Sequence, residues 1–165
     1  MFASLGIMPY LCPTSYYYIS SDTTLLYNSD TMAKNSKEEY KEENDKFLTY
    51  VAQRPDVKEL YNGILYRVIA SGSGKSPNAG SVVSVFYKGS LVNGRVFDSN
   101  MSAKVPDAFR LRDLIVGWQI AFKNMREGDK WVVYIPATYG YGKRGTHGIP
   151  GNSTLIFEIK LVKVN

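Results

Sequence analysis

The sequence predicts an α+β domain: a curved antiparallel β-sheet wrapped around one short helix, preceded by a helical N-terminal extension. Three observations predict it. After residue 63, several short segments alternate apolar and polar residues, which is the period of β-strands. In the same region only residues 114–125 have helical spacing. A separate amphipathic segment ends at Pro55. Several short strands with one helix suit a sheet folded across that helix.

Composition limits the class of protein. A chain of 165 residues, 44% of them hydrophobic, is long enough for one domain with an appendage and a proper core. Its single cysteine, Cys12, excludes an internal disulfide framework and a cysteine-based metal site. Its single histidine, His147, argues against a histidine-rich metal centre. We therefore expect neither a metal nor a cofactor.

Charge is distributed unevenly along the chain. Residues 1–63 carry six Lys and Arg against nine Asp and Glu, a net −3, whereas residues 64–165 carry fourteen against six, a net +8. A basic module can bind nucleic acid or another anionic surface, and such binding would weaken steeply with salt. However, the cations are dispersed through strands and turns, with no long basic run. A solubilising surface explains them better, and we expect no nucleic-acid partner.

Residues 1–35 are expected to be a poorly ordered leader and linker. The stretch 1–12 is moderately apolar and uncharged, and lacks the Lys or Arg that opens a secretory signal. It is either the tail of a longer signal or an ordinary disordered leader. The first reading favours the bacterial cell envelope (periplasm) over the cytoplasm, and the missing positive charge leaves the compartment open. The Ser-, Thr- and Tyr-rich stretch 13–31 predicts a linker.

Residues 36–62 are expected to form the helical extension. Ser36 and Glu39 have the spacing of a capping box, which predicts the start of a helix at Ser36. Four apolar residues then fall near one helical face: Tyr40, Phe47, Leu48 and Val51. Pro55 ends the helix. A single helix of this length needs a partner surface, and either its own domain or a second copy, in a homodimer through this helix, would provide one.

The remaining residues, 63–165, predict the sheet. Asn93-Gly94 lies between two alternating segments and predicts a hairpin with a type I′ turn. Helical spacing over 114–125 places Ile115, Trp118 and Phe122 on one face, and Glu127-Gly128-Asp129 closes that helix. The segments expected to be strands are 64–69, 82–87, the two arms of the hairpin over 91–97, 109–111, 131–135 and 154–164.

Six short motifs follow one another in this region. They are V-x-Y-x-G at Val85–Gly89, G-x-x-F-D-S at Gly94–Ser99, a G-W turn at Ile115–Trp118, M-x-x-G-D at Met125–Asp129, Y-G-Y-G at Tyr139–Gly142, and I-P with S-T-L-I-F within Ile149–Phe157. Each is weak alone, but their order and spacing are specific. From about Asn44 to Val164 the chain resembles the FKBP-type peptidyl-prolyl cis-trans isomerases, in the bacterial branch that carries an N-terminal helical extension.

The resemblance implies a site and its ligands. It implies four catalytic residues, Tyr87, Phe97, Asp98 and Tyr141. It implies a substrate-binding set in which Ile149 and His147 come from a bordering loop: Leu114, Ile115, Trp118, His147, Ile149 and Phe157. Proline-containing polypeptides are the implied partners, and macrolide inhibitors of the FK type are implied ligands. Such an isomerase assists protein folding, and its extension dimerises or holds client chains.

Two departures from the family pattern bear on macrolide affinity. Residues 101–107 lack the arginine and the second aromatic often found there, and Asp107 falls close to the place of that aromatic. Pro150-Gly151 stands where two prolines are common, so we expect a more mobile loop. Both departures put macrolide affinity in doubt more than isomerase activity.

The residues also suit this chemistry. The bond before proline rotates slowly because its planar form is resonance-stabilised and charge-separated. A dry aromatic pocket disfavours the planar form without a nucleophile or a metal. We expect Trp118 to form the floor, Tyr141 to donate a hydrogen bond to a substrate carbonyl, and Asp98 to accept one from Tyr87 or from a tyrosine of 139–141. The alternative function is a non-catalytic proline-binding or holdase module on the same scaffold. A structural explanation also exists for each residue, since aromatics in strands are usually core.

Overall fold

The computed structural model describes the backbone of residues 29–165 and the side chains of residues 36–165. Residues 1–28, which include Cys12 and most of the expected leader and linker, lie outside the described residues. The elements are α1 (Ser29–Ala52), β1 (Lys58–Tyr61), β2 (Ile64–Ala70), β3 (Val82–Leu91), β4 (Val96–Ser99), β5 (Asp107–Arg110), η1 (Leu111–Asp113), α2 (Val116–Asn124), β6 (Lys130–Ile135), η2 (Ala137–Tyr139) and β7 (Leu155–Val164).

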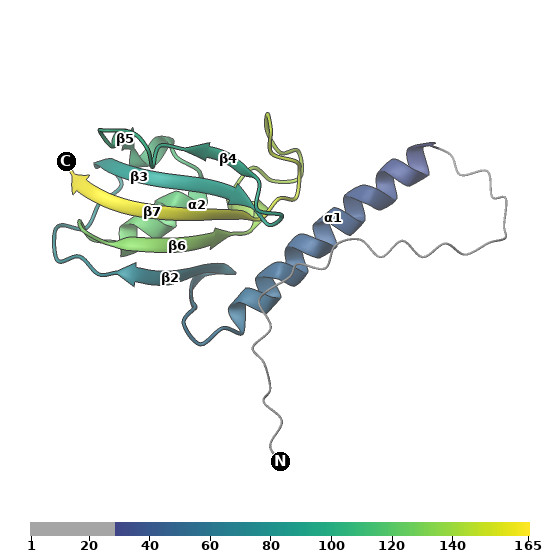
Figure 1. Ribbon diagram of the computed structural model, residues 1–165, viewed down its shortest axis with the longest axis horizontal. Helices are drawn as coiled ribbons and strands as arrows, with labels where there is room; N and C mark the ends of the chain where they lie inside the picture. Colours follow the sequence, from purple (N-terminus) through teal and green to yellow (C-terminus); the bar gives the residue numbers. More distant parts are fainter. Residues whose placement is uncertain (1–28) are drawn as a thin grey trace, which may run out of the picture.

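One antiparallel sheet forms the body of the molecule (Figure 1). Its strand order is β1-β2-β6-β7-β3-β4, and β5 pairs with the other part of β3. The sheet curves around α2, which lies against its inner face (Figure 1). The predicted fold class, a curved antiparallel sheet on one short helix after a helical extension, is confirmed.

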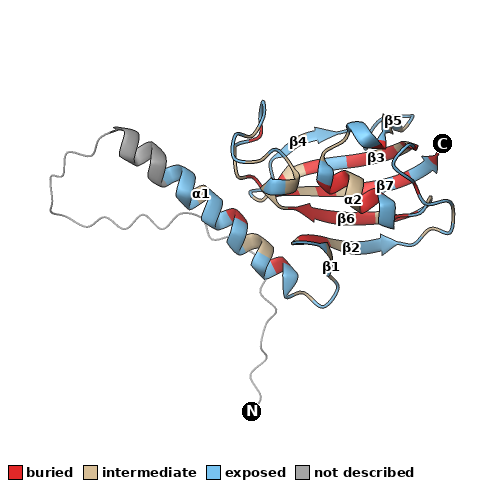
Figure 2. Ribbon diagram, turned by 180° about the vertical axis from the view of Figure 1, so that it is seen from behind, coloured by how far each residue is buried: buried red, intermediate tan, exposed pale blue. Residues whose placement is uncertain are grey.

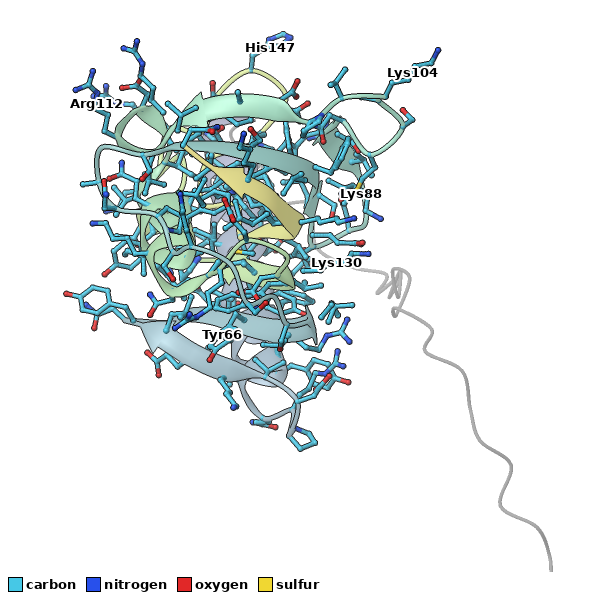
Figure 3. The ribbon with its side chains drawn as sticks, turned by 90° about the vertical axis from the view of Figure 1, so that its left-hand side faces the viewer. Tyr66, Lys88, Lys104, Arg112, Lys130 and His147 are labelled. Carbon is cyan, nitrogen blue, oxygen red and sulfur yellow. The ribbon has the colours of Figure 1, made fainter. Side chains whose placement is uncertain are left out.

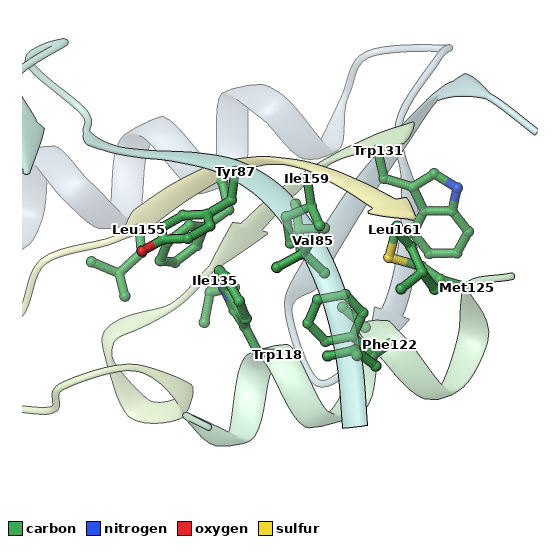
Figure 4. Packing of buried hydrophobic residues seen from close by; sticks show 14 of the residues in the cluster. Val85, Tyr87, Trp118, Phe122, Met125, Trp131, Ile135, Leu155, Ile159 and Leu161 are labelled. Carbon is green, nitrogen blue, oxygen red and sulfur yellow. The ribbon is translucent and has the colours of Figure 1, made fainter. Parts of the chain in front are cut away.

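The core lies between the sheet and α2. Along β3 every second residue from Val83 to Leu91 is buried, which is the alternation expected of a strand with one face on the core. From α2, Trp118, Ala121 and Phe122 are buried against these strands. Figure 4 shows the packed side chains, with Phe122 and Val85 between the two ends of the cluster.

The helix α1 packs on the outer face of the same sheet. Val51 is buried with Leu65 and Tyr134, and Phe47 and Leu48 pack against this second cluster. Figure 2 shows buried and half-buried positions on the side of α1 that faces the sheet, and exposed positions elsewhere along its described length. The apolar stripe of the helix therefore covers its own domain, which was one of the two partners left open by the sequence.

Three local predictions were wrong. The helix α1 begins at Ser29, so the Ser36–Glu39 pair lies inside it and does not start it. Residues 29–35 are accordingly helical and not linker. The segment 58–61, expected within the helical extension, is the strand β1. The alternation of polar and apolar residues in β1 is too short to detect in the sequence. The strand forms because it pairs with β2.

The third error concerns turn type. Asn62 and Gly63, at φ 42° and 83°, both have the positive φ of a type I′ turn, and they join β1 to β2. In the β3–β4 hairpin only Gly94 has positive φ, at 83°, and its amide donates to the Leu91 carbonyl. That pattern is a turn followed by one left-handed glycine, as in three-residue hairpin loops. The hairpin was predicted correctly and its turn type was not.

Candidate active site

A cavity of about 300 Å³ opens at one end of the core. Side chains from β3, β4, β5, α2, β7 and the loops between them form it. The lining residues are Tyr87, Phe97, Asp98, Phe109, Asp113, Leu114, Ile115, Trp118, Tyr141 and Phe157. Eight of the ten site residues expected from the sequence therefore meet in one place, although they lie on segments far apart in the chain.

Trp118 forms the floor of this cavity and is only 4% exposed. Its ring meets Tyr87 and Phe157 edge to face, with centroids 5.2 and 4.9 Å apart. Phe109 approaches in the same way at 6.2 Å. Edge-to-face contacts are a preferred aromatic geometry. The floor is thus held in place by the rings around it.

Gly89 on β3 allows two of the rings to come together. A Cβ at this position would lie 2.6 Å from the Phe97 ring and 2.7 Å from the Phe157 ring. These two rings pack edge to face with centroids 5.6 Å apart. Any side chain at residue 89 would force them away, so the glycine of the V-x-Y-x-G motif is required by close approach.

Tyr87 and Asp98 form the polar side of the cavity. The Tyr87 hydroxyl donates to Asp98 Oδ2 at 2.6 Å, as expected for one of the hydroxyls named from the sequence. Burial, then the hydrogen bond and the charge of Asp98, raise the pKa of Tyr87 well above its ordinary value of 10.0. Tyr87 therefore stays protonated at neutral pH and keeps Asp98 in one orientation.

Asn100 fixes the backbone beneath this pair. Its side-chain oxygen accepts from the Tyr87 amide at 2.6 Å, and its amide nitrogen donates to the Val85 carbonyl and to Asp107 Oδ2, each at 2.9 Å. Asn100 is 9% exposed, so these bonds replace solvent. The same contacts explain the position of Asp107: its carboxylate accepts a hydrogen bond from Asn100, and the residue does not line the cavity.

Tyr141 contributes a hydroxyl at the rim. The residue is 39% exposed and lines the cavity from the loop after η2. Partial burial, then the charge of Asp98, raise the pKa of Tyr141. Within residues 36–165 no group hydrogen-bonds its hydroxyl, so the proton is available to a ligand.

His147 and Ile149 lie apart from the main cavity. They line an adjacent groove of about 360 Å³ that shares Phe97, Asp98 and Tyr141 with it. Ile149 is 5% exposed, whereas His147 is exposed at the tip of the loop (Figure 3). The Arg95 guanidinium donates to the Gly148 carbonyl and ties this tip to the β3–β4 hairpin. Their substrate-binding role stays a prediction about the groove.

The sequence interpretation missed two lining residues, Phe109 and Asp113. Phe109 also packs edge to face on Tyr87, with centroids 6.0 Å apart, and adds an aromatic to the cavity just beyond residues 101–107. The alternation of 109–111 marked this strand, but only its pairing with β3 shows that Phe109 points at the cavity. Asp113 ends η1 and carried no signal of its own.

Metal-binding clusters and membrane-spanning helices are both absent from the described residues. In that part of the chain no three His, Cys, Asp or Glu side chains are grouped so as to hold a metal ion. Nor does any described helix have the length and apolar character needed to cross a membrane.

Comparison with known proteins places this site in a family. Residues 73–162 match the family model of the FKBP-type peptidyl-prolyl cis-trans isomerase. The chain is 41% identical over 124 residues to peptidyl-prolyl cis-trans isomerase Mip of Coxiella burnetii, covering 74% of this chain and 54% of that protein. It is 38% identical over 132 residues to FkpA of Escherichia coli strain K12, covering 80% and 47%. The chain thus spans about half the length of these relatives.

Solved structures agree with these matches. The crystal structure of a peptidyl-prolyl cis-trans isomerase from Pseudomonas syringae superposes with a TM-score of 0.73 at 36% identity, covering 78% of this chain and 96% of that one. The crystal structure of Escherichia coli FkpA gives 0.77 at 34%, covering 83% and 65%. With the motifs, the cavity and the family model in agreement, this chain belongs to the FKBP-type peptidyl-prolyl cis-trans isomerase family.

Proposed function

We propose that this chain catalyses cis-trans rotation about Xaa-Pro bonds in polypeptides. The ring-lined cavity above Trp118 carries the proposal. A volume of about 300 Å³ lies at the lower end of the range for small-ligand sites, which suits one residue and its flanking amide. Family membership adds support, and proline-containing polypeptides are the proposed substrates.

Desolvation supplies the rate enhancement. The planar amide is stabilised by charge separation that water solvates, and its rotation barrier is about 18–20 kcal/mol. In a cavity walled by Tyr87, Phe97 and Phe157, the planar form loses that solvation while the twisted form, with less charge separation, loses less. Lowering the barrier by about 7 kcal/mol would accelerate rotation roughly 10⁵-fold. No covalent step is required.

The polar residues orient the substrate. The Tyr141 hydroxyl donates to a substrate carbonyl, because it has no other acceptor within the described residues. Asp98 holds the Tyr87 hydroxyl and is chiefly structural. Leu114 and Ile115 extend the apolar wall around the proline ring.

The test is an exchange measurement on a short Xaa-Pro peptide, by protease coupling or by NMR. The parent protein should accelerate rotation, and Trp118→Leu and Tyr141→Phe should lower kcat/KM, the first by more than the second. Thr49→Ala, on the exposed face of α1, is the matched control. Binding of the peptide without acceleration over the uncatalysed rate would instead support the non-catalytic module.

Dimerisation through α1 stays a prediction. The apolar residues Phe47, Leu48 and Val51 already cover the sheet of their own domain. A homodimer would therefore use other faces of the helix. Light scattering measures the oligomeric state of the parent protein and of a Tyr50→Lys variant, in which an exposed residue of α1 is changed. A monomeric parent protein would contradict the prediction. Binding of FK-type macrolides is a further prediction, and fluorescence of Trp118 would report it.

A further inference from the structure

Helix α1 also reaches the loop that borders the active site. This loop, residues 140–154, joins η2 to β7 and is called here the pocket loop, because Tyr141 lines the cavity and Ile149 the adjacent groove. Figures 1 and 2 show α1 running past the end of the sheet from which the pocket loop projects. Within residues 36–52 of α1, two side chains hydrogen-bond to this loop, those of Tyr40 and Asn44.

Asn44 binds the end of the pocket loop. Its Oδ1 accepts from the Thr154 amide at 2.7 Å, and its Nδ2 donates to the Tyr40 carbonyl at 2.7 Å. Asn44 and Thr154 are each only 2% exposed, so removing the Asn44 side chain takes a buried partner from the Thr154 amide. The Asn44 side chain is thus bonded to its own helix through its nitrogen and to the loop through its oxygen.

Tyr40 binds Ser153, the loop residue just before Thr154. Its hydroxyl lies 2.8 Å from Ser153 Oγ, and Ser153 Oγ donates to the Pro150 carbonyl at 2.7 Å. Because the serine proton is directed to Pro150, Tyr40 is the donor to Ser153. This chain of bonds reaches Pro150-Gly151, the part of the loop that was expected to be mobile.

Hydrogen bonds within the pocket loop connect the end that α1 binds with the end that contains Tyr141. The Asn152 amide donates to the Gly142 carbonyl at 2.9 Å, and the Gly145 amide donates to the Tyr141 carbonyl at 3.1 Å. Tyr141 therefore lies near one end of a loop that is bonded across itself, and α1 holds the other end of that loop. Beside the contact, a cavity of about 350 Å³ separates Lys41 and Asp45 from Gly142 and Asn152, so the polar contacts stand next to open space.

We propose that Asn44 and Tyr40 are positioning residues for the active site: they hold the pocket loop so that Tyr141 meets the substrate. Helix α1 then contributes to the activity of the enzyme and does more than cover the outer face of the sheet. This inference rests on the proposed isomerase function, since Tyr141 acts on the substrate there. The structural half of it, control of the loop by the helix, can be tested without activity.

The first experiment measures amide hydrogen exchange in the full chain. Asn44→Ala should raise exchange of the amides of 142–154 about tenfold or more, while amides of β3 and β6 change little. Tyr40→Phe removes only one hydroxyl, a smaller change than Asn44→Ala, and should produce a smaller rise confined to 150–154. Tyr50→Phe removes a hydroxyl from an exposed position of the same helix and should change nothing. A rise spread evenly over the strands would show that α1 only stabilises the domain, and the inference would fail.

The second experiment separates kcat from KM on an Xaa-Pro peptide. A loosened loop lowers the fraction of molecules with Tyr141 in place, so KM rises in inverse proportion to that fraction. Asn44→Ala should raise KM about 3–10-fold and leave kcat within about twofold, because bound substrate restores the loop. If the parent protein is active and Asn44→Ala has the same KM as the parent, this inference is overturned while the proposed function stands. An inactive parent would overturn the proposed function, and loop exchange would still decide what α1 does.

Discussion

The two ends of the core each contain one buried tryptophan, but of these two rings only Trp118 lines one of the cavities described above, and its end is called here the hollow end. Trp131 stacks on Tyr66 with ring planes 29° apart and centroids 4.5 Å apart, and Met125 and Leu161 lie close to it (Figure 4). Trp118 instead meets its four ring neighbours at angles between 77° and 83°. Within the described residues both indole nitrogens lack a hydrogen-bond partner, so this feature does not distinguish the ends.

The difference lies in what surrounds each ring. Trp118 lies against the cavity that Tyr87 and Phe157 also line, whereas Trp131 is packed against Tyr66. At the hollow end Gly89 lets Phe97 and Phe157 close in from one side, and the polar pair Tyr87–Asp98 faces the remaining space. Four predictions test this comparison.

Replacing each tryptophan by alanine should have the largest effect. Both Trp118→Ala and Trp131→Ala remove a buried ring, and each should lower the free energy of unfolding by about 3–5 kcal/mol. Only Trp118→Ala should also abolish isomerase activity per folded molecule, because only that ring lines the cavity. Urea unfolding and the peptide assay measure the two quantities. Equal loss of activity in both variants would contradict the assignment of function to one end.

Gly89→Ala should show the cost of separating the two rings. The new methyl group would clash with Phe97 and Phe157, which should lower the free energy of unfolding by about 1–3 kcal/mol and reduce activity. At Gly80 a Cβ would meet only Asn78 Oδ1 at 3.4 Å. Gly80→Ala is therefore the control, with activity unchanged. A fully active Gly89→Ala protein would show that the ring contact is not required.

Tyr87→Phe should act on stability at high pH. The raised pKa of Tyr87 stabilises the folded state fully below the ordinary tyrosine pKa of 10.0, and this stabilisation is lost as pH rises above it. The parent should therefore lose stability more steeply than Tyr87→Phe above pH 10.0. At neutral pH, loss of the bond to Asp98 should cost about 0.5–1.5 kcal/mol. Urea unfolding across this pH range measures both, and parallel curves would contradict the raised pKa of Tyr87.

Glu158→Gln, on the outer face of the sheet, should have the smallest effect. Lys130 Nζ lies 2.6 Å from Glu158 Oε1, and this bond lowers the pKa of Glu158 below its ordinary value of 4.5. The pair should contribute about 0.2–1 kcal/mol, present above pH 4.5 and lost as pH falls through the lowered pKa. Isomerase activity should not change. A change in activity would mean that the outer face communicates with the cavity.

Much of the fold could be predicted because its signals are local. Alternation located β2, β6 and β7, and helical spacing located α2 with Trp118 and Phe122 on its buried face. The strand β1 could not be predicted, because its four residues are mostly exposed and gain their conformation from pairing. Nor could the length of β3, which continues to Leu91 because β7 pairs with it throughout.

The candidate site divides in the same way. Its motif residues, such as Tyr87 and Asp98, were identifiable because their types and spacing are specific, and their convergence followed from the resemblance. Phe109 was missed because an aromatic in a short strand looks like any core residue until its partner strand is known. The placement of His147 in a groove beside the cavity likewise depends on how the pocket loop is tied to Arg95.

By itself the sequence determined the kinds of element, the order of the motifs and the chemistry that they imply. Only the tertiary structure decided that the stripe on α1 covers its own sheet and that Asn44 holds the pocket loop. The reason is physical: periodicity depends on neighbours a few residues away, whereas Asn44 and Thr154 are 110 residues apart. A contact of that kind depends on how two distant segments pack.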